Sequence, residues 1–323
     1  MEFQKNVSLK DYTTFKIGGR AKYFCVVSAK PSLVEAIKLA KKMKLPFFVL
    51  GGGSNLLISD KGFNGLVIKI ENCKLKIKNC KVNVDAGVLL GKLVSAATGS
   101  GLTGLEWAAG IPGTVGGAVF GNAGAFQKSM KNVVKKVEVF DTKELRIDNY
   151  GLRDCRFGYR DSVFKQKKNQ STKQSFVLGR APKHIKNLCA RCPDLIILSV
   201  VFKLKKGRKS EIKKKIKEYL NYRKETQPLN YPSAGSVFKN PSPSQVFLKK
   251  FGRASGFSAG ELIQKCGLKG KKIGNAKISE KHANFIVNLG NARAKDVKKL
   301  INLAKKEVKK KFKINLEEEI ELL

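Results

Sequence analysis

Two glycine-rich stretches of this 323-residue chain offer backbone amide groups where side chains are nearly absent. The first is LGGGSNLL (50–57), and the second is IPGTVGGAVFGNAGAF (111–126), which mixes five glycines with apolar residues that require burial. A flexible linker is polar and rich in serine, so the second stretch is not typical of one. Glycine lets a backbone approach a ligand closely, and successive amide groups can bind an anion.

Neither stretch has the spacing of the common nucleotide-binding fingerprints, GxxxxGK[ST] and GxGxxG. The first stretch directly follows PFFVL (46–50), which predicts a short buried strand. Ser54 and Asn55 add side-chain donors to the three glycines before them. Two glycine loops in one α/β domain predict a long phosphorylated cofactor that lies between them.

Seven motifs, these two included, resemble those of the UDP-N-acetylenolpyruvoylglucosamine reductases, also called UDP-N-acetylmuramate dehydrogenases. The resemblance covers nearly the whole chain and is closer to the shorter class, which lacks a tyrosine-bearing insertion in the last domain. The motifs occur in this order: TTFKIGG (13–19), LGGGSNLL (50–57), GIPGTVGGAVFGNAGAF (110–126), FGYRDSVF (157–164), YPSAGSVFKNP (231–241), KHANFIVN (281–288) and LEEEIEL (316–322).

The resemblance implies an α+β protein. Its FAD-binding part would have the vanillyl-alcohol-oxidase (PCMH) fold in two α/β subdomains, residues 1–66 and 67–204. A C-terminal α+β domain, residues 205–323, would bind the substrate. Residues 166–196 interrupt the second subdomain as an unusual insertion, polar and low in complexity at its start, for which the sequence suggests no function.

The reaction that the resemblance implies is a hydride relay. NADPH reduces FAD, and flavin N5 delivers hydride to C3 of the enolpyruvyl group of UDP-N-acetylglucosamine-enolpyruvate. A proton at C2 then completes UDP-N-acetylmuramate, a peptidoglycan precursor. Such a site needs a cation for the substrate carboxylate, a proton donor and a group that polarises the developing enolate.

Three residues match the family's catalytic positions. Arg160 in FGYRDS would clamp the carboxylate, because a planar guanidinium is a bidentate donor. Ser236 in AGSVFKNP would deliver the proton, and Glu319 would assist at the enolate. Without the resemblance, the three adjacent glutamates that include Glu319 are typical of a solvated strand end. Glu321 stands where a cation is common in the family, which removes a local positive partner for Glu319.

The binding residues also follow from the resemblance. Tyr159, Lys239 and Asn240 would contact the substrate. His282 and Asn284 are further candidate pocket residues, and a structural role is the alternative for His282. The two glycine loops would bind FAD without a covalent link, through Gly51, Gly52, Gly53, Ser54, Asn55, Gly113, Thr114, Gly116, Gly117, Ala118, Gly121, Asn122, Ala123 and Gly124.

Two other functions remain open. One is a different FAD-dependent oxidase of the same fold that acts on a free sugar or alcohol. The motifs around Ser236 and Glu319 argue against it, because in the family they belong to the domain that binds the UDP-sugar. The other is a basic nucleic-acid-binding protein, which would leave the glycine loops unexplained.

Hydrophobic periodicity predicts the elements that must position these residues. The predicted strands are 21–27, 46–51, 82–87, 134–141, 145–151, 282–290 and 314–323. The predicted helices are 32–44 with Ser32 as its cap, 89–101, an amphipathic helix within 205–227 with Ser210 as its cap, 258–268 and 294–312.

The net charge of +40 suggests an anionic partner. However, the chain has 54 Lys against 11 Arg, and the lysines are spread along its whole length. Specific nucleic-acid readers depend on the arginine fork, so we expect solvated surface lysines and no specific nucleic-acid partner. The partner we expect is the small-molecule substrate.

Seven scattered cysteines, an odd number, are typical of free thiols in a reducing compartment. Cys189 and Cys192 form a single CxxC near His184, and no second pair completes a tetrahedral site, so no metal is predicted. The chain starts without an apolar signal core and has no run long enough to span a membrane. We therefore expect a cytoplasmic protein, and a monomer.

Overall fold

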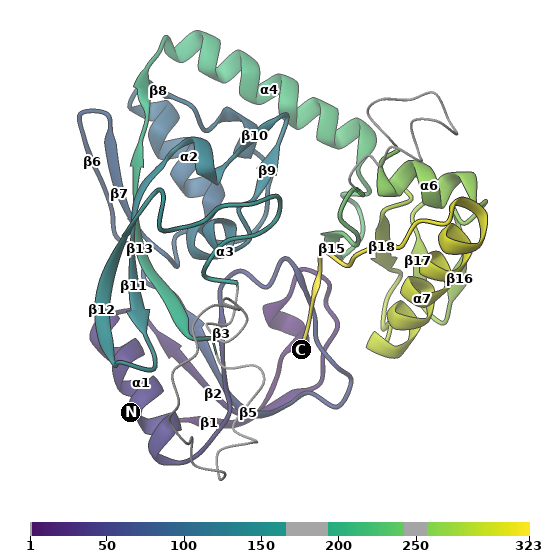
Figure 1. The fold of residues 1–323 in the computed structure, drawn as a ribbon, viewed down its shortest axis with the longest axis horizontal. Coiled ribbons are helices and arrows are strands. Elements are labelled where there is room, and N and C mark those ends of the chain that lie inside the picture. The colour runs from purple at the N-terminus through teal and green to yellow at the C-terminus, as the bar shows by residue number, and fades with distance from the viewer. Residues whose placement is uncertain (1, 166–192, 242–256) are drawn as a thin grey trace, which may run out of the picture. The chain divides into compact units, whose positions relative to one another are not determined.

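The computed structural model describes residues 2–165, 193–241 and 257–323 (Figure 1). The chain forms two compact units. The first contains Met1–Asn6, Ala21–Gly52 and Asn64–Tyr219, and the second contains Val7–Arg20, Gly53–Phe63 and Leu220–Leu323. The domain boundaries expected from the sequence, after residues 66 and 204, stay a prediction. The expected insertion lies almost wholly outside the described residues.

A four-stranded sheet opens the chain, with the order β1-β2-β5-β3 and with β3 parallel to β5. Helix α1 lies between β2 and β3 along the chain, so the predicted strand–helix–strand unit is confirmed. Leu33, Ile37 and Ala40 of α1 are buried in one apolar cluster with Phe47 and Leu66. The bounds are β1 Gln4–Ser8, β2 Arg20–Val27, α1 Lys30–Lys42, β3 Phe47–Leu50 and β5 Phe63–Ile70.

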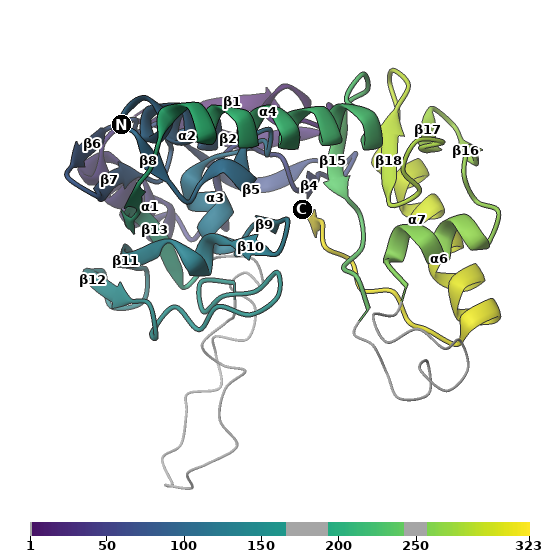
Figure 2. The ribbon, with the colours of Figure 1, turned by 90° about the horizontal axis from the view of Figure 1, so that it is seen from above.

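The second sheet of the first unit is antiparallel, with the order β12-β11-β13-β7-β6. Helices α2 and α3 pack on it, and Figure 2 shows α3 beside β11 and β13. The bounds are β6 Leu75–Lys78, β7 Lys81–Asp85, α2 Leu90–Gly99, α3 Val115–Phe120, β11 Val134–Asp141, β12 Arg146–Gly151 and β13 Leu195–Lys203.

Short elements complete this unit. Two small antiparallel pairs join β8 to β14 and β9 to β10. Helix α4 follows β14 along the chain, and the boundary between the two units falls within it, after Tyr219. The bounds are β8 Leu102–Thr103, η2 Glu106–Ala108, β9 Gly124–Ala125, β10 Lys128–Ser129, η3 Met130–Asn132, β14 Lys205–Lys206 and α4 Lys209–Thr226.

The second unit contains a four-stranded antiparallel sheet, β15-β18-β17-β16, whose apolar cluster includes residues of α6 and α7. The end of the chain contributes β19, which pairs in parallel with β4. The bounds are η1 Lys10–Tyr12, β4 Leu56–Leu57, β15 Ser233–Ser236, α6 Ala259–Lys265, β16 Lys272–Ile273, β17 Ala276–Ile278, β18 Phe285–Asn288, α7 Ala294–Phe312 and β19 Glu321–Leu322.

Three local predictions are wrong. Helix α1 begins at Lys30, with Pro31 in its first turn, so Ser32 lies inside the helix and does not cap it. Helix α4 begins at Lys209, which places Ser210 inside it as well. The predicted terminal strand 314–323 is reduced to β19 and an isolated bridge between Phe238 and Glu318. The segment pairs first with the residues after β15 and then with β4, so it forms no continuous strand.

The described part of the chain shows neither a membrane-spanning helix nor a cluster of His, Cys, Asp or Glu that could hold a metal. The cysteines it contains are free thiols: Cys25, Cys73, Cys80, Cys155 and Cys266. Burial raises the pKa of Cys25 to about 11 and that of Cys155 to about 12. Cys189, Cys192 and His184 lie outside the described residues.

Candidate active site

The two glycine loops lie directly against each other. A Cβ on Gly51 would come within 2.5 Å of Thr114 Oγ1, and one on Gly52 would come within 2.5 Å of the Gly113 Cα. Real Cβ atoms do not tolerate such distances, so any side chain at these positions would push the loops apart. Glycine is therefore required at Gly51 and Gly52 by the protein's own packing.

The first loop presents unused donors. In the described ranges, the backbone amides of Gly51, Gly52 and Gly53 donate no hydrogen bond to another protein group. The carbonyl oxygen of Gly51 faces inward and accepts a hydrogen bond of 2.7 Å from Lys69 Nζ. Burial lowers the pKa of Lys69. Three consecutive free amides after a strand fit the pyrophosphate of a dinucleotide cofactor.

The second loop divides into supporting and open positions. Gly116 is a supporting residue, because its amide donates to Ala86 and an added Cβ would lie 2.8 Å from the Ala86 Cβ. Gly117 and Gly121 are open, since an added Cβ would meet only single atoms at 3.6 Å and 3.8 Å. Thr114 caps α3 by accepting from the Gly117 amide. The two open glycines leave room for a flat ligand.

Arg160 lies in the same unit as the second loop and as Gly51 and Gly52 of the first. Its Nη1 donates a hydrogen bond of 2.9 Å to the carbonyl of Gly124, and its guanidinium lies 5.5 Å from the centre of the Tyr159 ring. The Tyr159 ring is 57% exposed, so it offers a surface to a ligand. The predicted substrate residues Tyr159 and Arg160 therefore border the end of the predicted cofactor loop.

Ser236 and Glu319 belong to neighbouring segments of the second unit. The amide of Glu319 donates 2.8 Å to the carbonyl of Val237, the residue after Ser236. The amide of Lys239 donates 2.9 Å to the carbonyl of Glu317, and its ammonium lies 3.3 Å from the Glu317 carboxylate. Two motifs about 80 residues apart in sequence are thus one paired segment, a contact that sequence periodicity does not reveal.

Other predicted binding residues have roles within the protein. Asn240 Oδ1 accepts from the amide of Ala259 at the start of α6. Asn55 Nδ2 donates 3.0 Å to the carbonyl of Glu319, and Ser54 precedes it in the same turn. Ala118 is buried, whereas Ala123 is partly exposed and its amide donates to the Ala118 carbonyl.

The side chains of His282 and Asn284 both hydrogen-bond to backbone groups. His282 Nδ1 accepts from the Asn284 amide at 3.2 Å, and burial lowers the pKa of His282. The Asn284 side chain bonds both to the amide of Phe238, at 3.0 Å, and to its carbonyl, at 2.8 Å. Asn284 lies in the turn just before β18, and hydrophobic periodicity gives no signal for this role.

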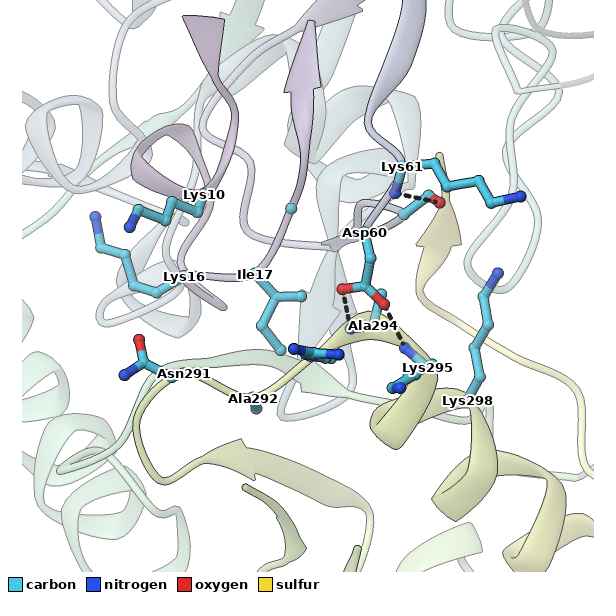
Figure 3. A pocket seen from close by; sticks show the side chains of 13 residues that line it. Lys10, Lys16, Ile17, Asp60, Lys61, Asn291, Ala292, Ala294, Lys295 and Lys298 are labelled. Atoms are coloured by element: carbon cyan, nitrogen blue, oxygen red, sulfur yellow. Dashed lines mark hydrogen bonds between the residues drawn. The ribbon is translucent and has the colours of Figure 1, made fainter. Parts of the chain in front are cut away.

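A separate cationic pocket of about 690 Å³ lies within the second unit, at the start of α7 (Figure 3). The Asp60 carboxylate accepts from the amides of Ala294 and Lys295, at 2.7 and 3.0 Å, and so occupies the helix N-terminus. Lys10 and Lys16 extend to one side of the pocket and Lys61 to the other. The ammonium groups do not converge on one point, so this pocket has no defined anion site.

Comparison with known proteins finds relatives that match the whole chain. A family model described as an FAD binding domain matches residues 21–145, and one described as the C-terminal domain of UDP-N-acetylenolpyruvoylglucosamine reductase matches residues 227–323. The UDP-N-acetylenolpyruvoylglucosamine reductase of Caldicellulosiruptor bescii is 42% identical, over 100% of this chain and 91% of that protein. That of Caldanaerobacter subterraneus subsp. tengcongensis is 39% identical, over 98% and 92%. The chain belongs to the UDP-N-acetylenolpyruvoylglucosamine reductase family.

A solved structure agrees with this assignment. The crystal structure of the UDP-N-acetylenolpyruvylglucosamine reductase of Thermus caldophilus matches with a TM-score of 0.76 and 36% identity, over 100% of this chain and 99% of that one. The resemblance drawn from the seven motifs is confirmed, and so are the α+β fold and the class of FAD-dependent oxidoreductase. The free amides of the first loop and the open glycines of the second are the features that fit FAD.

Proposed function

We propose that the chain reduces UDP-N-acetylglucosamine-enolpyruvate to UDP-N-acetylmuramate at the expense of NADPH. The observation that carries this proposal is the hydrogen bond from the Glu319 amide to the carbonyl of Val237, the residue after Ser236, because it brings two predicted catalytic segments together. The full-length similarity of the chain to the family supports the same reaction. Bound FAD would supply the hydride chemistry, by accepting hydride from NADPH and donating it to C3 of the enolpyruvyl group.

The residues of the chain have separate tasks in this reaction. The amides of Gly51, Gly52 and Gly53 bind the cofactor's pyrophosphate, and Gly117 and Gly121 leave space for the rest of it. The remaining loop residues of the predicted FAD set line or support these two surfaces, except Asn122, whose side chain hydrogen-bonds to Gly158 and Lys131 instead.

Arg160 holds the substrate carboxylate, since a guanidinium matches a carboxylate with two parallel hydrogen bonds. This contact also stabilises the negative charge that develops when C3 gains hydride. The Ser236 hydroxyl donates the proton to C2, and Glu319 orients the enolate end of the substrate. Tyr159, Lys239 and Asn240 are the proposed contacts to the sugar and diphosphate.

The proposal includes a setting for the reaction. We expect a cytoplasmic monomer that takes part in peptidoglycan precursor synthesis, and through it in cell wall biogenesis and cell division. Residues 1–66 and 67–204 are proposed as the FAD-binding subdomains and residues 205–323 as the substrate domain. Nucleic-acid binding is expected to be weak, blind to sequence and lost at moderate salt. Size-exclusion chromatography and binding to unrelated oligonucleotides at two salt concentrations test these points.

A two-step spectroscopic experiment tests the reaction. The purified FAD-loaded protein is mixed with NADPH without oxygen, and bleaching of the visible absorbance of the oxidised flavin is expected. UDP-N-acetylglucosamine-enolpyruvate is then added, and the absorbance should return with formation of UDP-N-acetylmuramate. Reduced flavin that this substrate does not reoxidise would overturn the proposal. Reduction by a free sugar instead would favour the oxidase alternative.

A further inference from the structure

Arg160 occupies the third position of a tight turn. The amide of Gly158 donates 3.0 Å to the carbonyl of Asp161, and the amide of Asp161 donates 3.3 Å back to the carbonyl of Gly158. Tyr159 and Arg160 are the two residues between them. Arg160 has φ 54°, in the left-handed region where this turn position favours glycine. A long side chain is held there only when the surroundings fix the backbone.

Asn122 supplies one such constraint. Its Nδ2 donates a hydrogen bond of 2.7 Å to the carbonyl of Gly158, the same oxygen that closes the turn. Its Oδ1 accepts from the amide of Lys131 at 3.0 Å. Asn122 is 6% exposed, so both ends of its amide are engaged inside the protein. The Gly158–Asp161 turn is thereby bound to the backbone that follows β10.

Two further hydrogen bonds bind the turn to the second glycine loop. Ser162, which is fully buried, donates 2.6 Å from its Oγ to the carbonyl of Phe120. Arg160 Nη1 reaches the carbonyl of Gly124. The loop from Phe120 to Gly124 therefore binds the turn at three points, which are Gly158, the Arg160 guanidinium and Ser162. Ser162 is a buried polar residue that the sequence reading did not single out.

We propose that Asn122 is a positioning residue for substrate recognition, which fixes the Gly158–Asp161 turn and so aims the Arg160 guanidinium at the substrate carboxylate. The inference rests on the proposed role of Arg160. Asparagine suits the position for two reasons. It has a donor and an acceptor on one short side chain, and it tolerates its own φ of 43° better than most residues.

Two substitutions separate the parts of this role. Asn122→Asp keeps the acceptor for Lys131 but removes the donor to Gly158, whereas Asn122→Gly removes the side chain and leaves a residue that adopts positive φ readily. Asn132→Asp is the matched control. Asn132 lies ten residues along the same stretch. Its Oδ1 accepts from the Ser129 amide at 2.8 Å and from Ser129 Oγ at 3.5 Å, and an aspartate keeps both acceptor roles.

The first measurements are the rate of flavin reoxidation by the substrate and the affinity for a substrate analogue. Displacements of a catalytic group by about 1 Å cost roughly 100-fold in rate. Both Asn122 variants should therefore reoxidise reduced flavin with the enolpyruvyl substrate about 10- to 100-fold more slowly. Their affinity for UDP-N-acetylglucosamine, which lacks the enolpyruvyl carboxylate, should equal that of the parent. Their FAD content and oxidised flavin spectrum should also be unchanged, as should every property of Asn132→Asp.

A double-mutant cycle with Arg160→Ala decides the inference. If Asn122 acts through Arg160, Asn122→Gly should cause no further loss of reoxidation rate in the Arg160→Ala background. If the double variant loses as much reoxidation rate as the product of the two single losses, the positioning role is overturned. A shifted flavin spectrum or lost FAD in both Asn122 variants would overturn it as well, because Asn122 would then contact the cofactor. Failure of the parent protein to turn over the enolpyruvyl substrate would instead count against the proposed function.

Discussion

The side-chain amide of Asn55 donates a hydrogen bond of 3.0 Å to the backbone carbonyl of Glu319. The carbonyl of Asn55 in turn accepts from the amide of Glu321 at 2.9 Å, and β4 and β19 pair directly after it. Asn55 lies within the first glycine loop, two residues after its last glycine. The segment that contains the proposed catalytic glutamate and leads into the last strand, β19, is therefore fastened to the end of the predicted cofactor loop.

Asn55→Asp should destabilise the protein. The aspartate places a carboxylate against the Glu319 carbonyl and loses the only donor between the two, which costs on the order of 1 kcal/mol for a partly buried pair. The free energy of unfolding of the FAD-loaded protein in urea measures this loss. Asn64→Asp, at an exposed position of β5, is the control and should change stability little. Equal stability of both variants would show that the Asn55 bond contributes nothing.

Gly117→Val should lower FAD occupancy without unfolding the protein. The added Cβ meets only Thr114 Oγ1 at 3.6 Å, an ordinary contact, so the side chain projects into the space proposed for the cofactor. Gly91→Val in α2 is the matched control, because a Cβ on Gly91 meets nothing within 4 Å. The ratio of flavin absorbance to protein absorbance should fall for Gly117→Val alone. Full flavin content in that variant would remove Gly117 from the cofactor site.

The stability of the fold should decrease below about pH 6.5, the usual pKa of histidine, partly through His282. Burial lowers the pKa of His282 in the folded state, and its Nδ1 must stay unprotonated to accept from Asn284. The unfolded chain therefore binds more protons at this residue between the two pKa values, and stability falls as pH falls through that window. His282→Asn keeps an acceptor but cannot titrate. Its unfolding free energy should drop less between pH 7.5 and 5.5 than that of the parent. An equal drop would show that His282 does not contribute to the pH dependence of stability.

The sequence predicts the elements of the fold better than the contacts of the site. Hydrophobic periodicity predicts α7 with the bounds observed, and the glycine-rich composition marks both loops. Periodicity carries no information on the pairing of Val237 with Glu319, because that contact joins distant segments. The left-handed backbone of Arg160 is equally invisible, since local propensity predicts glycine there and three tertiary hydrogen bonds override it.

Ser236→Ala should block the second half of the reaction and spare the first. Reduction of the flavin by NADPH involves no proton transfer to substrate C2, so the variant should bleach at the parent's rate. Reoxidation by UDP-N-acetylglucosamine-enolpyruvate should then slow by about 10²- to 10⁴-fold, the usual contribution of a general acid. Stopped-flow absorbance measures the two steps separately.

Ser233→Ala is the control for this experiment. Ser233 lies at the other end of β15, and its carbonyl, which alanine retains, accepts from Thr14 Oγ1 at 2.8 Å. Alanine removes only a long contact of 3.4 Å from the Gly235 amide to Ser233 Oγ. The control should keep both half-reactions near the parent's rates. Ser236→Cys should retain part of the reoxidation rate, because a thiol also donates a proton. Reoxidation of Ser236→Ala at the parent's rate would show that Ser236 is not the proton donor, and Glu319 or a water molecule would then take that role.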